Sequence, residues 1–153
     1  LLIDTPPALT NSIQLIIDLA DFVVLPVRPS PHDLRSIGGT LSVVHSLNKP
    51  FLFVLNAASP RAYITGEARP VLAECGEVAA TTLHSRVDFA TSMVDGHTVM
   101  EIPGARKSAH EMNALWGEIF ASIELLEKPD KTASCDYLEV SPVPEVQKLV
   151  GGR

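Results

Sequence analysis

The sequence predicts an α/β fold, with a mostly parallel sheet and helices on both of its faces. Two observations lead to this prediction. Short aliphatic and aromatic runs alternate along the chain with longer segments whose apolar residues recur every three or four positions. The short runs suit strands that are buried on both faces, and the longer segments suit helices that pack on a sheet. Alternation of the two predicts βαβ units with parallel strands and right-handed crossovers.

Four apolar runs are expected to form the strands, namely residues 1–3, 22–27, 51–55 and 78–83. Polar residues follow three of them directly, because Asp4, Asn56 and His84 each stand where a run ends. In open α/β sheets, ligands bind at the carboxyl ends of the strands. We therefore expect a binding site at this edge. The residues alone leave Asp4 with two interpretations, a ligand of a nucleotide's magnesium ion or a turn cap.

Helices are expected at residues 11–19, 31–47, 65–75, 87–93 and 108–126. Their predicted N-caps are Thr10, Ser30, Thr65 and Ser108, each of a type whose side-chain oxygen can accept a hydrogen bond from the first turn. Ser108 and Glu111 have the spacing of a capping box. In the last helix, the spacing of Trp116 and Phe120 predicts core residues rather than a ligand-stacking box. Cys75 is likewise expected in the core.

The composition fits a single soluble domain, with 153 residues of which 46% are hydrophobic and 20% charged. A net charge of −6 argues against a generally basic nucleic-acid binder, so DNA binding would need a local basic patch, a partner or an oligomer. Cys75 and Cys135 lie far apart, which suggests neither a zinc site nor a disulfide framework. A reducing cytoplasm is the simplest compartment.

Targeting and membrane segments are not predicted. No run reaches the roughly 20 apolar residues that span a bilayer, and the first residues lack the charged start of a signal peptide. The chain has no initiator Met and begins within an expected strand, from which we expect the carboxyl-terminal part of a longer protein. Residues 1–128 would be part of one domain. Residues 129–153, rich in Lys, Asp, Ser and Pro, would be a flexible tail.

Four blocks of the sequence resemble a known family, the ParA/MinD-type deviant-Walker ATPases, and most closely the small plasmid-partition ParA proteins. The blocks are Ile3-Asp4-Thr5-Pro6-Pro7, residues 20–34 (ADFVVLPVRPSPHDL), residues 86–96, and Thr98-Val99-Met100-Glu101 leading into Lys107-Ser108-Ala109. The second block is the most specific of the four. Together the blocks cover residues 1–126.

The resemblance implies a P-loop NTPase fold that binds ATP and Mg²⁺ at the sheet edge and sandwiches ATP between two subunits. It implies that Asp4 is the Walker B acid, the catalytic and metal-binding carboxylate. Asn56 matches the position that hydrogen-bonds adenine. The loop of Leu83, His84 and Ser85 would close over the base through backbone contacts. Arg86 matches a recurrent family arginine that could brace this loop, although a surface salt bridge explains Arg86 nearly as well.

One part of the family pattern is absent. The glycine-rich Lys-Gly-Gly-x-Gly-Lys-Thr loop that cradles the phosphates occurs nowhere in this chain, and neither Gly38-Gly39 nor Gly151-Gly152 has its lysines or its strand-to-helix context. We interpret this as truncation before Leu1. The chain alone is then expected to be inactive, since the backbone donors and lysines for phosphate are missing.

The function implied is that of an ATPase in plasmid or chromosome partitioning. The ATP-bound homodimer would bind DNA nonspecifically, a centromere-binding ParB-type partner would stimulate release, and the protein would be cytoplasmic and nucleoid-associated. The candidates for DNA contact are Arg61, Arg69, Arg106 and Lys107.

Two alternatives stay open. The first is a non-enzymatic binding or regulatory domain that retains the fold without the P-loop. The second is a MinD-like membrane-associated protein, which ranks last because residues 145–153 are too short and too polar for an amphipathic membrane helix.

Overall fold

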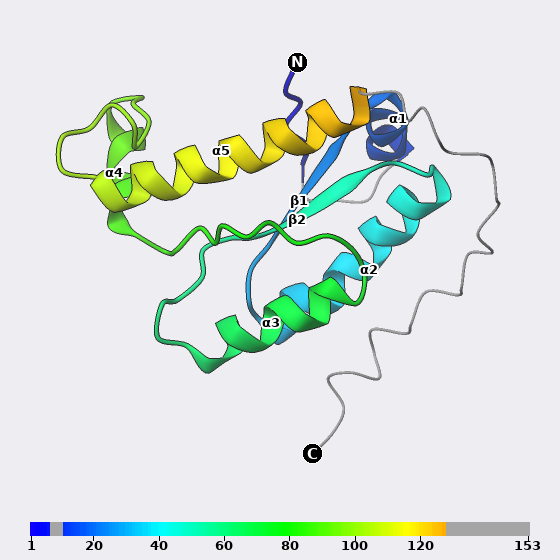
Figure 1. Ribbon diagram of the computed structural model, residues 1–153, viewed down its shortest axis with the longest axis horizontal. Coiled ribbons are helices and arrows are strands. Elements are labelled where there is room, and N and C mark those ends of the chain that lie inside the picture. Colours follow the sequence, from blue (N-terminus) through cyan, green and yellow to red (C-terminus); the bar gives the residue numbers. More distant parts are fainter. Residues whose placement is uncertain (7–10, 128–153) are drawn as a thin grey trace.

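The computed structural model describes residues 1–6 and 11–127, and the described chain forms five helices and two strands (Figure 1). In chain order they are α1 (Asn11–Leu19), β1 (Val23–Val27), α2 (Pro31–Ser46), β2 (Phe51–Leu55), α3 (Tyr63–Ala73), α4 (Val87–Val94) and α5 (Arg106–Glu127). The α/β class predicted from the sequence is confirmed. Within the described helices, none is long and apolar enough to cross a membrane.

The sheet consists of β1 and β2, which pair in parallel. The register runs from Val23 opposite Phe51 to Val27 opposite Leu55. The β1–α2–β2 segment is thus the βαβ unit that the alternating pattern predicts. Pro26, which has no backbone N–H, is tolerated in β1 because in this sheet the strand has a partner along one edge only.

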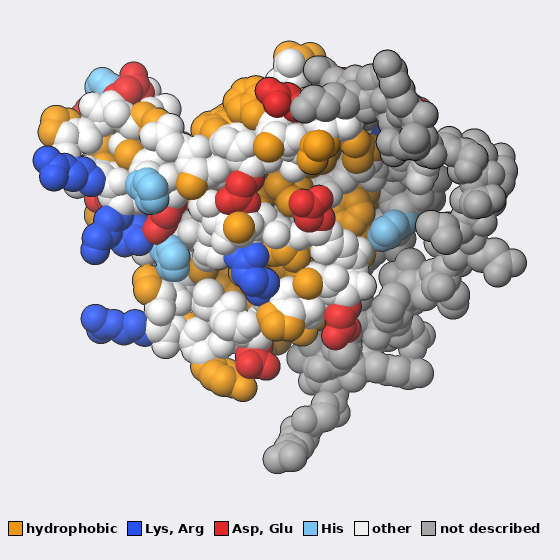
Figure 2. Space-filling model, in the orientation of Figure 1, with side chains coloured by type: hydrophobic (Ala, Val, Ile, Leu, Met, Phe, Trp, Pro, Cys, Tyr) orange, Lys and Arg blue, Asp and Glu red, His pale blue; other side chains and the backbone are white. Residues whose placement is uncertain are grey.

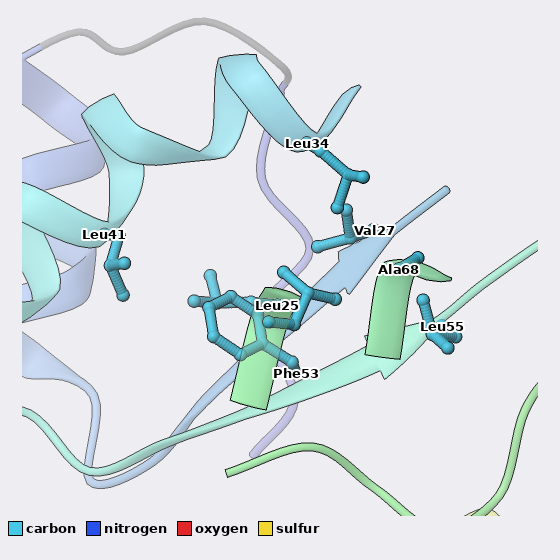
Figure 3. Close-up of a cluster of buried hydrophobic side chains, with 8 residues drawn as sticks. Leu25, Val27, Leu34, Leu41, Phe53, Leu55 and Ala68 are labelled. Atoms are coloured by element: carbon cyan, nitrogen blue, oxygen red, sulfur yellow. The ribbon is translucent and has the colours of Figure 1, made fainter. Parts of the chain in front are cut away.

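Helices cover both faces of this sheet, as predicted, and the alternation of side chains along the strands decides what each face touches. On one face, α2 and α3 bury a cluster made up of Leu25, Val27, Leu34, Leu41, Phe53, Leu55, Ala68 and Leu72 (Figure 3). On the other face, Leu115 of α5 packs with Leu52, Val54 and Ala79. Strand β2 is therefore buried between two helical layers.

Local sequence signals account for where α2 begins. Ser30 has an extended backbone, and its hydroxyl oxygen accepts a hydrogen bond from the backbone N–H of Asp33 at 3.1 Å. Pro31 stands at the first helical position, where its missing N–H costs nothing. The predicted start of this helix is confirmed. Thr10, the expected cap of α1, lies outside the described residues.

The strand expected at residues 1–3 is not formed. Residues 1–6 have no regular secondary structure, and the exposed fractions of Leu1, Leu2 and Ile3 are 116%, 78% and 48%. A parallel strand needs a neighbour for its hydrogen bonds and two layers to bury its side chains. These residues have neither in the structure, so an apolar run alone does not make the strand.

The weaker strand expected at residues 78–83 is also wrong as a continuous element. Only two isolated parallel bridges remain, Phe53 with Val78 and Ala58 with His84. Ala79 still donates to the carbonyl oxygen of Phe53 at 2.8 Å, and Leu83 to that of Leu55 at 2.9 Å. Between them the backbone bonds to side chains: Arg69 donates to the carbonyl oxygen of Ala80 at 3.0 Å, and Glu118 accepts from the N–H groups of Ala80 and Thr81 at 2.6 and 2.9 Å. The ladder is therefore interrupted at residues 80 and 81.

Two helix starts differ from the prediction. Thr65 lies inside α3, and its hydroxyl donates to the carbonyl oxygen of Ser59 at 2.9 Å rather than capping the helix. Ser108 lies inside α5, fully buried, and its hydroxyl donates to the Asp88 carboxylate at 2.6 Å. The capping box of Ser108 and Glu111 is therefore wrong, because both side chains bond to the segment that precedes α5 instead.

Trp116 and Phe120 are not in the core, contrary to the prediction. Their exposed fractions are 39% and 58%, and their rings lie against each other with centroids 5.4 Å apart. Leu115 and Ile119 face the sheet, and the next residue in each case lies about 100° further around the helix. A helix that packs along one narrow stripe leaves that neighbouring position uncovered.

Cys75 is half-buried against the cluster on the α2–α3 face. Burial and the nearby Glu74 carboxylate raise the pKa of its thiol. The prediction that Cys75 is a core residue is thus confirmed in part, because Cys75 packs at the border of the core cluster. The tail expected at residues 129–153, which includes Cys135, lies outside the described residues.

Candidate functional site

The carboxyl end of the sheet brings together residues from two distant parts of the chain. The backbone N–H of Asn56, directly after β2, donates to the carbonyl oxygen of Val27 at the end of β1, at 2.9 Å. The N–H of Leu83 then donates to the carbonyl oxygen of Leu55, also at 2.9 Å. Residues 83–86 consequently run alongside the segment that leaves β2. We call residues 55–58 and 83–86 the carboxyl-edge site.

Further backbone bonds fasten the two halves of this site. Ala58 donates to the carbonyl oxygen of Leu83 at 3.0 Å, and Ser85 donates to the carbonyl oxygen of Ala58 at 2.9 Å. Ala58 is fully buried, whereas Leu83 and His84 are half-buried and Ser85 is exposed. The site thus has a rigid base and an accessible rim.

Asn56 lies at this rim with a half-buried side chain. Its side-chain oxygen accepts a hydrogen bond from the N–H of Ala57 at 2.8 Å, and Ala57 has the positive φ of 50° that the tight turn requires. Among the described residues, the amide NH₂ of Asn56 has no protein acceptor. The structure therefore places next to residues 83–86 an amide that can donate to a ligand.

Glu111 of α5 joins the carboxyl-edge site to the helix that covers it. Its carboxylate accepts from the backbone N–H of His84 at 3.1 Å and lies 2.9 Å from His84 Nδ1. Arg86 Nη2 donates to the same carboxylate at 2.5 Å. The side chains are mostly buried, with exposed fractions of 14% for Glu111 and 25% for Arg86. Charge-assisted hydrogen bonds in such surroundings are stronger than exposed ones.

This arrangement shifts the acidities of both ionic groups. Burial by itself disfavours the Glu111 carboxylate, but the hydrogen bonds from Arg86 and His84 outweigh it and lower its pKa. The hydrogen bond to Glu111 is the main cause that raises the pKa of Arg86. Both groups are therefore charged at neutral pH. Through Glu111, Arg86 is linked to the backbone of His84, and its assignment as a brace of residues 83–86 stays a prediction.

The lowered pKa of Glu111 predicts a pH-dependent contribution to stability. A group whose pKa is depressed by folding stabilises the protein above its ordinary pKa, here 4.5, and loses that contribution as the pH falls through the folded value. Glu111→Gln should therefore lower the free energy of unfolding at pH 7, and the gap from wild type should shrink as the pH falls below about 4.5. Urea unfolding of both proteins at several pH values measures this gap. A gap that stays constant down to acid pH would contradict the prediction.

Within the described residues, no hydrogen bond links Asp4 to the carboxyl-edge site. Asp4 is exposed and belongs to no strand. The described residues also contain no group of three or more His, Cys, Asp or Glu side chains that could hold a metal ion. A single carboxylate is nevertheless of the type that Mg²⁺ uses, because this ion commonly takes one or two carboxylates and completes its shell with phosphates and water. The assignment of Asp4 as metal ligand stays a prediction.

The four basic candidates for DNA contact separate into two groups. Arg61, Arg106 and Lys107 are exposed. Figure 2 shows Lys and Arg side chains along the left edge of the molecule, from the corner of α4 and α5 down to the loop between β2 and α3. Arg69 instead donates to Ala79, Ala80 and Thr82 within the chain. Its contacts favour a structural role.

The sequence analysis did not identify two glutamates of α5 that accept hydrogen bonds from the segment before the helix. Glu111 accepts from His84 and Arg86. Glu118 accepts from the backbone N–H groups of Ala80 and Thr81, at 2.6 and 2.9 Å. A signal was present in the sequence. Both glutamates fall within one turn of Leu115 on its own face of the helix, where an acid needs hydrogen-bond donors.

Comparison with known proteins identified one relative of this chain. No family model matches the chain. Over 129 residues the chain is 32% identical to a protein of Halothiobacillus neapolitanus, and the match covers 78% of this chain. The chain spans 59% of that relative's length. The protein to which this chain is similar is the maintenance of carboxysome distribution protein A.

Proposed function

We propose that this chain is part of a ParA/MinD-type ATPase that positions a large cellular cargo. The observation that supports the proposal most is the carboxyl-edge site, where Asn56 and residues 83–86 lie side by side at the ends of parallel strands. Ligands of open α/β sheets bind at this edge. The similarity to a protein of carboxysome distribution supports positioning as the broader role.

The hydrogen-bond pattern of the site fits the amino group that adenine carries at position 6 of its ring. The N–H groups of Leu83, His84 and Ser85 are all bonded within the protein. Backbone contacts with a base would therefore use carbonyl oxygens, which accept but do not donate. The exocyclic amino group of adenine can donate to such an oxygen, whereas the oxygen at the same position of guanine cannot. Asn56 would complete the contact with its amide NH₂.

The phosphates and the metal ion would be bound by other residues. Asp4 would hold Mg²⁺ directly or through water, and the ion would neutralise charge on the phosphates. The glycine-rich phosphate loop is not in this chain, so hydrolysis requires a phosphate loop upstream of Leu1. In our proposal this chain supplies the base-binding part and the metal carboxylate.

The remaining steps would follow from dimerisation. Two subunits would enclose ATP, and the dimer would bind DNA nonspecifically through Arg61, Arg106 and Lys107. A ParB-type or functionally equivalent partner on the cargo would stimulate release. The protein would then be cytoplasmic and associated with the nucleoid. The cargo could be a protein body, as the name of the relative indicates for that protein, or a plasmid.

DNA binding of a protein that joins this chain to a phosphate loop tests the proposal. We expect binding to mixed-sequence DNA with ATP and Mg²⁺, and affinity that falls steeply between about 50 and 200 mM salt, because phosphate contacts release counterions. A double variant of Arg61→Ala and Lys107→Ala should reduce the salt slope by about 1 to 2. Arg35→Ala, an exposed arginine outside the candidate set, is the matched control. Absence of ATP-dependent binding at low salt would refute the proposal.

A second candidate function is a non-enzymatic binding or regulatory domain. A start codon shortly upstream of Leu1, with no glycine-rich loop encoded between that codon and Leu1, would favour this second function. Binding of a partner protein without any nucleotide would then be the expected activity.

A further inference from the structure

We propose that residues 146–150 of this chain dock into a groove at the amino end of the sheet. The groove has a volume of about 360 Å³ and lies at the opposite end of the strands from the carboxyl-edge site. We call it the amino-end groove. Its apolar lining is Phe22, Phe51, Cys75, Leu125 and Leu126. The inference is independent of the proposed function, because it involves neither nucleotide nor DNA.

The aromatic ring of Phe51 lines the groove and is held from several sides. It packs edge-on against the rings of Phe53 and His45, with centroids 5.2 and 5.4 Å apart. The backbone of Gly76 lies so close that a Cβ atom there would be 2.5 Å from the Phe51 ring. These contacts fix the ring, so this wall of the groove belongs to the packed core.

Another wall of the groove is left uncovered in the described chain. Leu125 and Leu126, in the last turn of α5, have exposed fractions of 69% and 50%. α5 ends one residue later at Glu127, and residues 128–153 follow. A segment tethered this close to a surface has an effective concentration in the millimolar range. The residues that follow α5 are therefore the first candidates to cover these two leucines.

The charge at the rim of the groove narrows the choice among these residues. Glu77 lines the groove and Glu74 adjoins it, and both are exposed. Neither has an ion-pair partner within the part of the chain that the structure describes. Lys49 also lines the groove, but its Nζ already donates to the carbonyl oxygen of Asp18 at 2.5 Å and lies 4.0 Å from the Asp18 carboxylate. The rim therefore favours an apolar segment that carries a cation.

Two apolar runs follow α5, and they differ in charge. Residues 136–140 (Asp-Tyr-Leu-Glu-Val) carry two acids and no base, so like charges would meet at the rim. Residues 146–150 (Val-Gln-Lys-Leu-Val) carry Lys148 among three aliphatic side chains and no acid. Glu145 precedes this run and Arg153 follows it, which leaves the region with one acid and two bases. The second run therefore matches both the apolar lining and the acidic rim.

The test uses Cys75, whose half-buried thiol lines the groove and would be covered by the docked residues. In the full chain with Cys135→Ser, Cys75 is the only cysteine left, so its rate of alkylation by iodoacetamide reports docking. With a millimolar effective concentration and a dissociation constant of about 0.1 mM, roughly nine in ten molecules would be docked. Leu149→Ser, which removes an apolar contact, should then speed alkylation by up to about tenfold.

Matched changes in the same part of the chain are the controls. Leu138→Ser removes the same side chain from the other apolar run and should leave the alkylation rate unchanged. Lys148→Glu should speed alkylation, because the new carboxylate would meet Glu77, whereas Lys131→Glu should not. All of these substitutions lie after α5, so the core around Cys75 is the same in every variant.

A cross-link measures the contact directly. In the Cys135→Ser chain, Val150→Cys adds a thiol to the docking residues, and a short bismaleimide should join it to Cys75 within one molecule. The wild-type chain, with Cys75 and Cys135, is the control and should form its intramolecular cross-link several times more slowly. Peptide mass spectrometry identifies the joined pair.

Three outcomes would overturn the proposal. The first is an alkylation rate in Leu149→Ser equal to that of its parent. The second is a faster rate in Leu138→Ser alone, which would assign the groove to residues 136–140. The third is protection of Cys75 that grows with protein concentration, because a second copy of the chain would then be the occupant.

Discussion

Asp4→Ala is expected to lower Mg²⁺-dependent ATP turnover by about 100-fold or more, provided that a phosphate loop is present upstream of Leu1. A metal ion at the phosphates supplies several kcal/mol of charge stabilisation in the transition state, and each 1.4 kcal/mol is about tenfold in rate. The variant should fold as well as wild type, because Asp4 is exposed and lies in no strand of the described chain. Steady-state turnover at varied Mg²⁺ measures the effect.

The control for this experiment is Asp21→Ala. Asp21 is also an exposed aspartate, placed just ahead of β1 at the opposite end of that strand from the carboxyl edge. Its removal should leave turnover unchanged. Retained turnover in Asp4→Ala would show that Asp4 is only a turn residue, which is the other interpretation of the sequence.

Phe53→Ala is expected to lower the free energy of unfolding by about 3 to 5 kcal/mol, the range for buried aromatic truncations. Phe53 is fully buried at the centre of β2. Its ring packs at 80° to that of Phe51, with centroids 5.2 Å apart, and lies in the cluster under α2 and α3 (Figure 3). A cavity there is hard to refill, because both neighbouring elements are anchored by other side chains.

Phe120→Ala supplies the matched control, since it removes the same atoms from a side chain that is 58% exposed. Its cost should be well below that of Phe53→Ala. Urea unfolding measures both losses. If the slope of the unfolding free energy against urea concentration is the same in both variants and wild type, the differences are changes in stability. Equal losses for the two variants would show that Phe120 is covered in solution. Phe53→Leu, which keeps most of the apolar volume, should lose less than Phe53→Ala and guards against complete unfolding.

The local elements of this fold follow from short-range patterns. The aliphatic run 22–27 and the run 51–55 formed β1 and β2, and the Ser30-Pro31 signal began α2 where expected. The alternation of strand and helix also sufficed for parallel pairing. Each of these features depends on the periodicity of apolar residues or on a cap within a few positions, and both can be read without knowing the partners.

The carboxyl-edge site could be predicted in part for the same reason. Asn56 and residues 83–86 were expected at one edge because carboxyl ends of parallel strands coincide, and the structure brings them together. The apolar run 1–3, which is also followed by a polar residue, predicted a strand in the same way but formed none. The difference is that β1 and β2 had each other as hydrogen-bond partners, while residues 1–3 had none in the described chain.

By itself, the sequence determined the α/β class, the parallel β1–α2–β2 unit and the polar edge at its carboxyl end. Only the tertiary structure decided that Glu111 and Glu118 bond to the backbone of residues 80–84, that Arg69 is held within the chain, and that Trp116 and Phe120 are exposed. These facts depend on how α5 and α3 are placed against the sheet. A spacing of three or four identifies a helix, but the surface that each side chain meets is set by residues far away in the sequence.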